Sequence, residues 1–218
     1  MKKNAFILFA LTNFAMITGM SAQDATTTVI DDNRETLRFG VKAGINLSNV
    51  YNEENNDYVA DNKVGFAAGA FVAIPFGKLL GFQPEVMYSE KGFKVSGSIL
   101  GNDYEYKRTN TYIDIPLQLQ IKASPVFTIL AGPQFSYLIQ TKNNFNNGDF
   151  TNEQEQDING ENYKKNIFGF VVGADLNFSS LVISGRAGWD ISKTDTEGNS
   201  SDVNYKNQNL QLTVGYVF

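Results

Sequence analysis

Residues 37–48, with the sequence LRFGVKAGINLS, alternate between apolar side chains and side chains that are polar or absent. One face carries Leu37, Phe39, Val41, Ala43, Ile45 and Leu47, and the other carries Arg38, Gly40, Lys42, Gly44 and Asn46. A period of two is typical of a β-strand, because successive side chains point to opposite sides of the backbone. An amphipathic helix would repeat its apolar positions about every 3.6 residues. The stretch therefore predicts a strand with one apolar face.

The same alternation recurs along the rest of the chain, which gives about eight such segments. The further segments are residues 64–74, 80–88, 113–121, 127–139, 168–178, 181–191 and 210–218. Each is near the length of about 9–11 residues with which a tilted strand crosses a bilayer. The pattern predicts an all-β protein.

Short and long connections alternate between these segments. The short ones, residues 75–78, 123–125 and 177–180, are rich in turn-forming residues, whereas residues 48–62, 92–103, 141–164 and 193–204 are long and polar. In an up-and-down barrel consecutive connections lie at opposite ends, so all the short ones share one end. We therefore expect a closed antiparallel transmembrane β-barrel with short periplasmic turns and long external loops.

Periodicity does not say which face points inward, and a soluble lipocalin-like barrel is the alternative. The polar face carries charged and amide side chains at mid-strand, as a filled polar lumen requires, whereas aromatic side chains lie near both ends of the apolar face, as in membrane-interface girdles. The predicted lumen network is Lys42, Glu85, Asp114, Gln134, Arg186 and Gln211, with Gln118 nearby. The predicted interface aromatics are Phe82, Tyr88, Phe127, Tyr137, Phe168, Phe178, Trp189, Tyr216 and Phe218. These two sets favour the membrane barrel.

The first residues have the order of a secretory signal. Lys2 and Lys3 precede an apolar run over residues 5–17, and the small residues Ser21 and Ala22 follow. An N-terminal membrane anchor is the alternative, but the run is short for a span. We expect a signal peptide at residues 1–22, a flexible periplasmic lead-in at 23–36 and a barrel domain at 37–218.

Several runs are similar to a known family: FGVKAGINLS at 39–48, QPEVMYSEKG at 83–92, YIDIPL at 112–117, AGPQ at 131–134 and the ending YVF at 216–218. They resemble the PorT-like outer-membrane β-barrel proteins, and the resemblance extends from Leu37 onward. It implies a small barrel in a Gram-negative outer membrane, surrounded by lipid, with a terminal aromatic that the barrel-assembly machinery reads. The family is broad and only its namesake is tied to a secretion apparatus, so the resemblance implies no single activity.

The amino-acid composition excludes several classes of catalytic and metal-binding site. The chain has no His and no Cys, which removes Ser-His-Asp catalysis, thiolate nucleophiles and the commonest metal ligands. We therefore expect no cofactor and no enzymatic activity, although Glu85 and Asp114 are formally a glycosidase-like carboxylate pair. A net charge of -5 and a pI near 4.8 argue against a nucleic-acid partner.

Two functional hypotheses follow. The first is a non-enzymatic anchor and interaction protein whose external loops meet a protein or ligand. The second is a transport or secretion accessory, either a narrow channel or part of an export assembly. The two hypotheses differ in the role of the charged lumen residues. An eight-stranded barrel is just wide enough for side chains to fill its interior. The lumen charges form a paired polar plug in the first hypothesis and line a proton or small-solute path in the second.

Overall fold

The computed structural model describes residues 32–51, 61–99, 102–146, 151–156, 165–192 and 206–218. After the short 3-10 helix η2 (Asn33–Glu35), the described chain is almost entirely β-strand. The strands are β1 (Arg38–Tyr51), β2 (Asp61–Pro75), β3 (Leu80–Ile99), β4 (Asn102–Lys122), β5 (Phe127–Asn146), β6 (Thr151–Gln156), β7 (Asn166–Phe178), β8 (Leu181–Asp190) and β9 (Lys206–Val217). In this part of the chain no helix is both long and apolar enough to traverse a bilayer.

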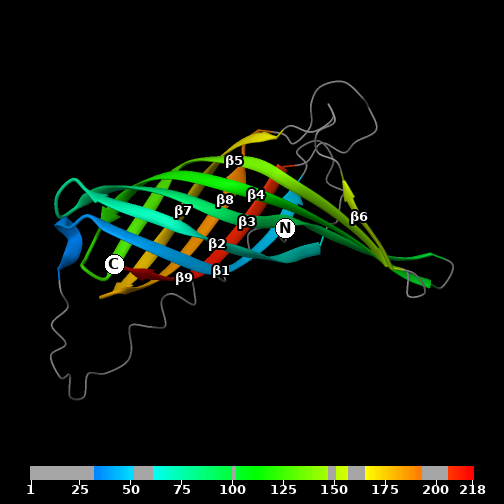
Figure 1. Ribbon diagram of the computed structural model, residues 1–218, viewed down its shortest axis with the longest axis horizontal. Helices are drawn as coiled ribbons and strands as arrows, with labels where there is room; N and C mark the ends of the chain where they lie inside the picture. The colour runs from blue at the N-terminus through cyan, green and yellow to red at the C-terminus, as the bar shows by residue number, and fades with distance from the viewer. Residues whose placement is uncertain (1–31, 52–60, 100–101, 147–150, 157–164, 193–205) are drawn as a thin grey trace, which may run out of the picture.

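The strands close into a ring. The order is β4-β3-β2-β1-β9-β8-β7-β5-β6, all the pairings are antiparallel, and an additional pairing joins β4 to β5. Strand β6 pairs only with the far end of β5, so the other eight strands form the barrel. Figure 1 shows η2, the β2–β3 turn and the C-terminus at one end, with β6 at the other. The predicted up-and-down barrel is confirmed.

The polarity of the barrel is that of a membrane protein. Along β1, Val41 and Ile45 are 48% and 53% exposed, whereas Lys42 and Asn46 are 3% and 0% exposed. The other barrel strands repeat this arrangement, with apolar side chains outside and mostly polar or small side chains inside, although Phe71, Met87 and Tyr112 are large buried side chains. A soluble barrel would bury the apolar face instead. The observed burial therefore excludes the lipocalin-like alternative.

Glycine is needed where the narrow interior brings strands close together. A β-carbon on Gly44 in β1 would collide with the backbone oxygen of Leu212 in β9, and one on Gly132 in β5 would collide with the backbone oxygen of Leu117 in β4. Both positions point into the lumen, between larger polar side chains of the same strand. Because glycine has no side chain at these two positions, the neighbouring polar side chains can occupy the lumen there.

The external ends of several strands differ from the expectation. Residues 92–103 and 141–164 were predicted as loops, but β3 continues to Ile99, β4 begins at Asn102, β5 continues to Asn146 and β6 adds a strand. Glycine and polar residues are frequent in both stretches, as in loops, yet residues 92–99 also contain Phe93, Val95 and Ile99. Cross-strand pairs such as Ser96 with Glu105 place these residues in a sheet. Residues 52–60 and 193–204 of the predicted loops lie outside the described residues.

The end of the predicted flexible lead-in is also structured. Asp32 caps η2, and the Arg34 guanidinium donates to both of its carboxylate oxygens at 2.7 and 2.8 Å. This hydrogen bonding lowers the pKa of Asp32 to about 2. Lys122 Nζ in turn donates to the backbone oxygen of Arg34 at 2.5 Å, so the turn is attached to the end of β4. The predicted signal peptide and residues 23–31 lie outside the described residues.

We expect Leu212→Arg to reduce the free energy of unfolding by about 2–4 kcal/mol, because Leu212 lies mid-strand on the apolar face, where an arginine would enter the bilayer. Urea unfolding of the protein in phospholipid vesicles measures this change. The matched control is Ser96→Arg in the external part of β3, with an expected change within about 0.5 kcal/mol. Equal losses in both variants would contradict this assignment of the lipid-facing band.

Candidate functional site

The centre of the lumen holds a cluster of four charged side chains from four strands. Lys42 Nζ of β1 lies 2.6 Å from Glu85 Oε2 of β3. Arg186 Nη2 of β8 lies 3.5 Å from Glu85 Oε1, and Arg186 Nη1 lies 2.6 Å from Asp175 Oδ1 of β7. All four side chains are almost fully buried. Two cations thus balance two anions, which is the pairing that buried charges require. We refer to these residues as the central ion cluster.

Asp114 belongs to a separate pair and not to this cluster. Lys91 Nζ contacts Asp114 at 2.9–3.0 Å and lies 5.1 Å from the centre of the Tyr112 ring. Further toward the external end, Asn207 Nδ2 donates to Asp190 Oδ2 at 2.6 Å. The lumen charges therefore form at least two groups along the barrel axis. Glu85 and Asp114 thus each have their own cation and belong to different groups.

Amide side chains fill the space between these groups. Gln134 Nε2 donates to Ser136 Oγ at 3.2 Å, and Gln211 Nε2 donates to Asn46 Oδ1 at 3.0 Å. Gln118 is 0% exposed, and within the described part of the chain neither its amide nitrogen nor its oxygen has a hydrogen-bond partner. It lines a small internal cavity together with Glu85 and Arg186. Polar cavities of this kind commonly hold water.

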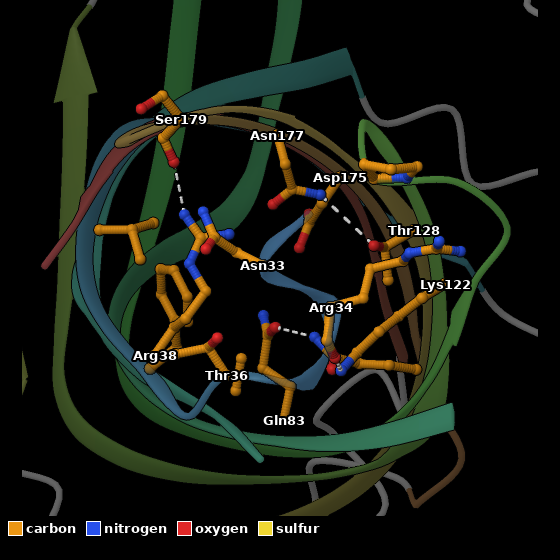
Figure 2. A pocket seen from close by; sticks show the side chains of 15 residues that line it. Asn33, Arg34, Thr36, Arg38, Gln83, Lys122, Thr128, Asp175, Asn177 and Ser179 are labelled. Atoms are coloured by element: carbon orange, nitrogen blue, oxygen red, sulfur yellow. Dashed lines mark hydrogen bonds between the residues drawn. The ribbon is translucent and has the colours of Figure 1, made fainter. Parts of the chain in front are cut away.

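A second cavity opens at the short-turn end of the barrel. Its lining includes Arg38, Gln83, Lys122 and Asp175 (Figure 2). Asp175 is also a member of the central ion cluster, whose residues Glu85 and Arg186 line the internal cavity. The central ion cluster thus lies between the two cavities.

Sequence reasoning missed several lumen residues. Lys91 and Asp175 fall on the polar faces of their strands, but nothing in the sequence indicated that they are the partners of Asp114 and Arg186. Gln83, which donates to Glu85 at 2.8 Å and accepts from Gln120 at 2.5 Å, was missed in the same way. The available signal was strand periodicity, which assigns a face but not a partner across the lumen.

The structure places the predicted interface aromatics on the outside of the barrel. Phe82 and Phe127 are partly exposed and the others are exposed. Two of them pack against outward-facing rings that the prediction did not include. Tyr88 lies 6.5 Å from Phe66, and Phe168 lies 5.1 Å from Phe135, between ring centroids. At the other end, Tyr216 and Phe218 are 5.3 Å apart.

Outside the barrel the strands continue as a sheet. Strands β3, β4 and β5 have 20, 21 and 20 residues, whereas β8 has 10. Tyr104, Tyr106 and Arg108 all lie in the external part of β4. We define the external sheet as residues 92–99, 102–111, 140–146 and 151–156.

Side-chain contacts hold the external sheet together. The Tyr104 and Phe145 rings stack at 6.2 Å, and Tyr106 Oη donates to Asn143 Oδ1 at 2.9 Å. Lys94 forms an ion pair with Glu105. Within the described ranges, no group of three or more acidic side chains is arranged to bind a metal ion.

Comparisons with known proteins agree with this architecture. The model of the family described as "Outer membrane protein beta-barrel domain" matches residues 21–195. No curated protein matches the sequence.

Solved structures with a similar fold include small outer-membrane barrels. Ail, the attachment invasion locus protein of Yersinia pestis, is 13% identical with a TM-score of 0.43, and the match covers 83% of this chain and 98% of that one. Neisserial surface protein A is 12% identical with a TM-score of 0.44, covering 83% and 97%. OprG of Pseudomonas aeruginosa is 12% identical with a TM-score of 0.38, covering 83% and 95%. With the family model matching most of its length, the chain belongs to the outer membrane protein beta-barrel domain family and is a protein of the outer membrane.

Proposed function

We propose that this protein is a non-enzymatic outer-membrane anchor whose closed barrel holds the external sheet for contact with a partner outside the cell. The observation that carries the proposal is the length of β3, β4 and β5, each about ten residues longer than a transmembrane strand needs. At about 3.3 Å per residue, ten surplus residues reach roughly 30 Å beyond the barrel. Sheet edges and aromatic side chains at such a position are common features of protein-binding surfaces.

The filled lumen supports the anchoring role. The central ion cluster and the Lys91–Asp114 pair occupy the interior with matched charges. In an eight-stranded barrel such side chains leave little space for a solute. We also propose that the lumen residues are a structural plug and that the outward aromatics anchor the barrel at the two membrane interfaces.

One observation favours a second candidate function. Polar cavities lie on both sides of the central ion cluster, so a rearrangement of that cluster would join them into a narrow path. Under this alternative the ion pairs would be a gate and not a permanent plug.

We expect Glu85→Gln to reduce the free energy of unfolding by about 3–5 kcal/mol, because the buried cations Lys42 and Arg186 would lose the carboxylate that they share. The matched control is Glu105→Gln, which removes a partly exposed ion pair and has an expected cost of at most about 1 kcal/mol. Urea unfolding in vesicles compares the two. A loss below about 1 kcal/mol for Glu85→Gln would argue against a structural plug.

We expect the refolded protein to give no discrete single-channel openings in planar lipid bilayers, since the central ion cluster blocks the lumen. Openings in the unaltered protein whose frequency or conductance changes in Glu85→Gln or Arg186→Gln, and does not change in Glu105→Gln, would favour the conduit. Migration of folded and boiled samples on a gel verifies that each variant is a barrel.

A shortened hairpin tests the anchoring role directly. Residues 96–105 are replaced by Asn-Gly, which closes the pair Val95–Tyr106 with a two-residue turn. We expect the barrel to fold as before, while cross-linking in intact cells no longer recovers the partners captured by the full chain. Retention of the same partners would show that the β3–β4 part of the external sheet is not the contact surface.

A further inference from the structure

The cavity at the short-turn end is lined by an excess of positive charge. Arg34 of η2, Arg38 of β1 and Lys122 of β4 all contribute to its wall (Figure 2). The amide side chains of Asn33 and Gln83 supply further hydrogen-bonding groups around it. The acidic side chain in the wall, Asp175, is bonded to Arg186 of the central ion cluster at 2.6 Å. The wall therefore presents cations that the lumen pairing does not neutralise.

Lys122 is the buried member of this group. The residue is 6% exposed, and its ammonium group donates to the backbone oxygen of Arg34 at 2.5 Å. Within the described residues no carboxylate lies within ion-pair distance of it, in contrast to Lys42 and Lys91. Glu35, the nearby acidic residue of the η2 turn, is exposed and forms no ion pair in this part of the chain. The ammonium group thus has little exposed area and no carboxylate partner, and it faces a cavity that opens at the end of the barrel, so the cavity is suited to an added anion.

Arg38 strengthens the same conclusion. It is half-buried, and its Nη2 donates to the backbone oxygen of Ser179 at 2.5 Å, which fixes the guanidinium at the edge of the cavity. No ion pair involving Arg38 is present among the described residues. Arg34 differs, because Asp32 already holds its side chain by two hydrogen bonds. Arg38 and Lys122 are thus the two cations with capacity for a ligand.

We propose that this cavity binds a phosphate group. A planar guanidinium fork and an ammonium point charge are the side chains that most often bind phosphate oxygens, and here they occupy the wall of one cavity. The short-turn end faces the periplasm, and the headgroups of the inner leaflet lie on that side of the membrane. The phosphate can therefore belong to a phospholipid headgroup or to a free phosphate of the periplasm. This binding site is additional to the external contact surface proposed above.

The experiment observes the arginine Nε–H signals of the refolded full chain by NMR in octyl glucoside micelles, which contain no phosphate. Inorganic phosphate is titrated in one arm, and dihexanoylphosphatidylglycerol in the other, with uncharged dihexanoylglycerol as the blank. We expect a saturable shift of the Arg38 signal, while the signal of Arg108 in the external sheet stays unchanged. Lipid binding that is tenfold tighter than phosphate binding identifies a headgroup site, and equal or weaker lipid binding identifies a free-phosphate site.

Variants connect the binding to the cavity. We expect Lys122→Gln to weaken binding at least tenfold, and Lys78→Gln to change it less than twofold, because Lys78 is an exposed cation in the nearby β2–β3 turn that does not line the cavity. Heat-modifiable gel migration verifies folding. If Lys122→Gln does not fold, Arg38→Gln is tested with Arg34 as the reporter. Absence of a shift with both probes, or unaltered binding in these variants, would overturn the proposal.

Discussion

Closure of the backbone hydrogen-bond network is the constraint on which the rest of this structure depends. In lipid an unpaired N–H or C=O costs several kcal/mol, so a sheet can cross the membrane only as a ring without edges. The pairing of β1 with β9 and of β4 with β5 provides that ring. Once it is closed, one face of every strand must contact lipid and the other must fill a narrow lumen. The inverted burial of Val41 and Lys42 is a direct consequence.

The narrow lumen in turn determines the chemistry inside. Charges with little access to water need partners, and the central ion cluster supplies them across strands that are far apart in sequence. Toward the periplasmic end the balance changes, because Lys122 and Arg38 have no carboxylate partner among the described residues. The two ends of the barrel are therefore chemically different. The external end extends as a sheet, whereas the periplasmic end is a basic cavity partly covered by η2 (Figure 2).

The number of barrel strands and the two faces of each strand were predictable, because both depend on local periodicity. The outer-membrane character was predictable from the side chains that each face carries. Alternation such as Leu37 to Leu47 needs no knowledge of the neighbouring strands. The limits of the external strands were not predicted, since residues 141–146 are mostly polar and Gly97 interrupts the apolar alternation of residues 92–99. They become strands only because a partner strand offers backbone hydrogen bonds and contacts such as Tyr104 with Phe145. β-structure depends on such non-local pairing more than on intrinsic preference.

The sequence by itself divided each barrel strand into an apolar and a polar face, because a period of two assigns every side chain of a strand to one of two sides. The mid-strand charges and the aromatics near the strand ends then indicated that the apolar face meets lipid. Only the tertiary structure decided which lumen residues meet. Lys42 and Glu85 lie on β1 and β3, with β2 between them, and Asp114 pairs with Lys91 and not with the central ion cluster. Contacts across the lumen depend on barrel curvature and strand stagger, which are properties of the closed ring as a whole. The convergence of Arg38 and Lys122 on one cavity has the same origin.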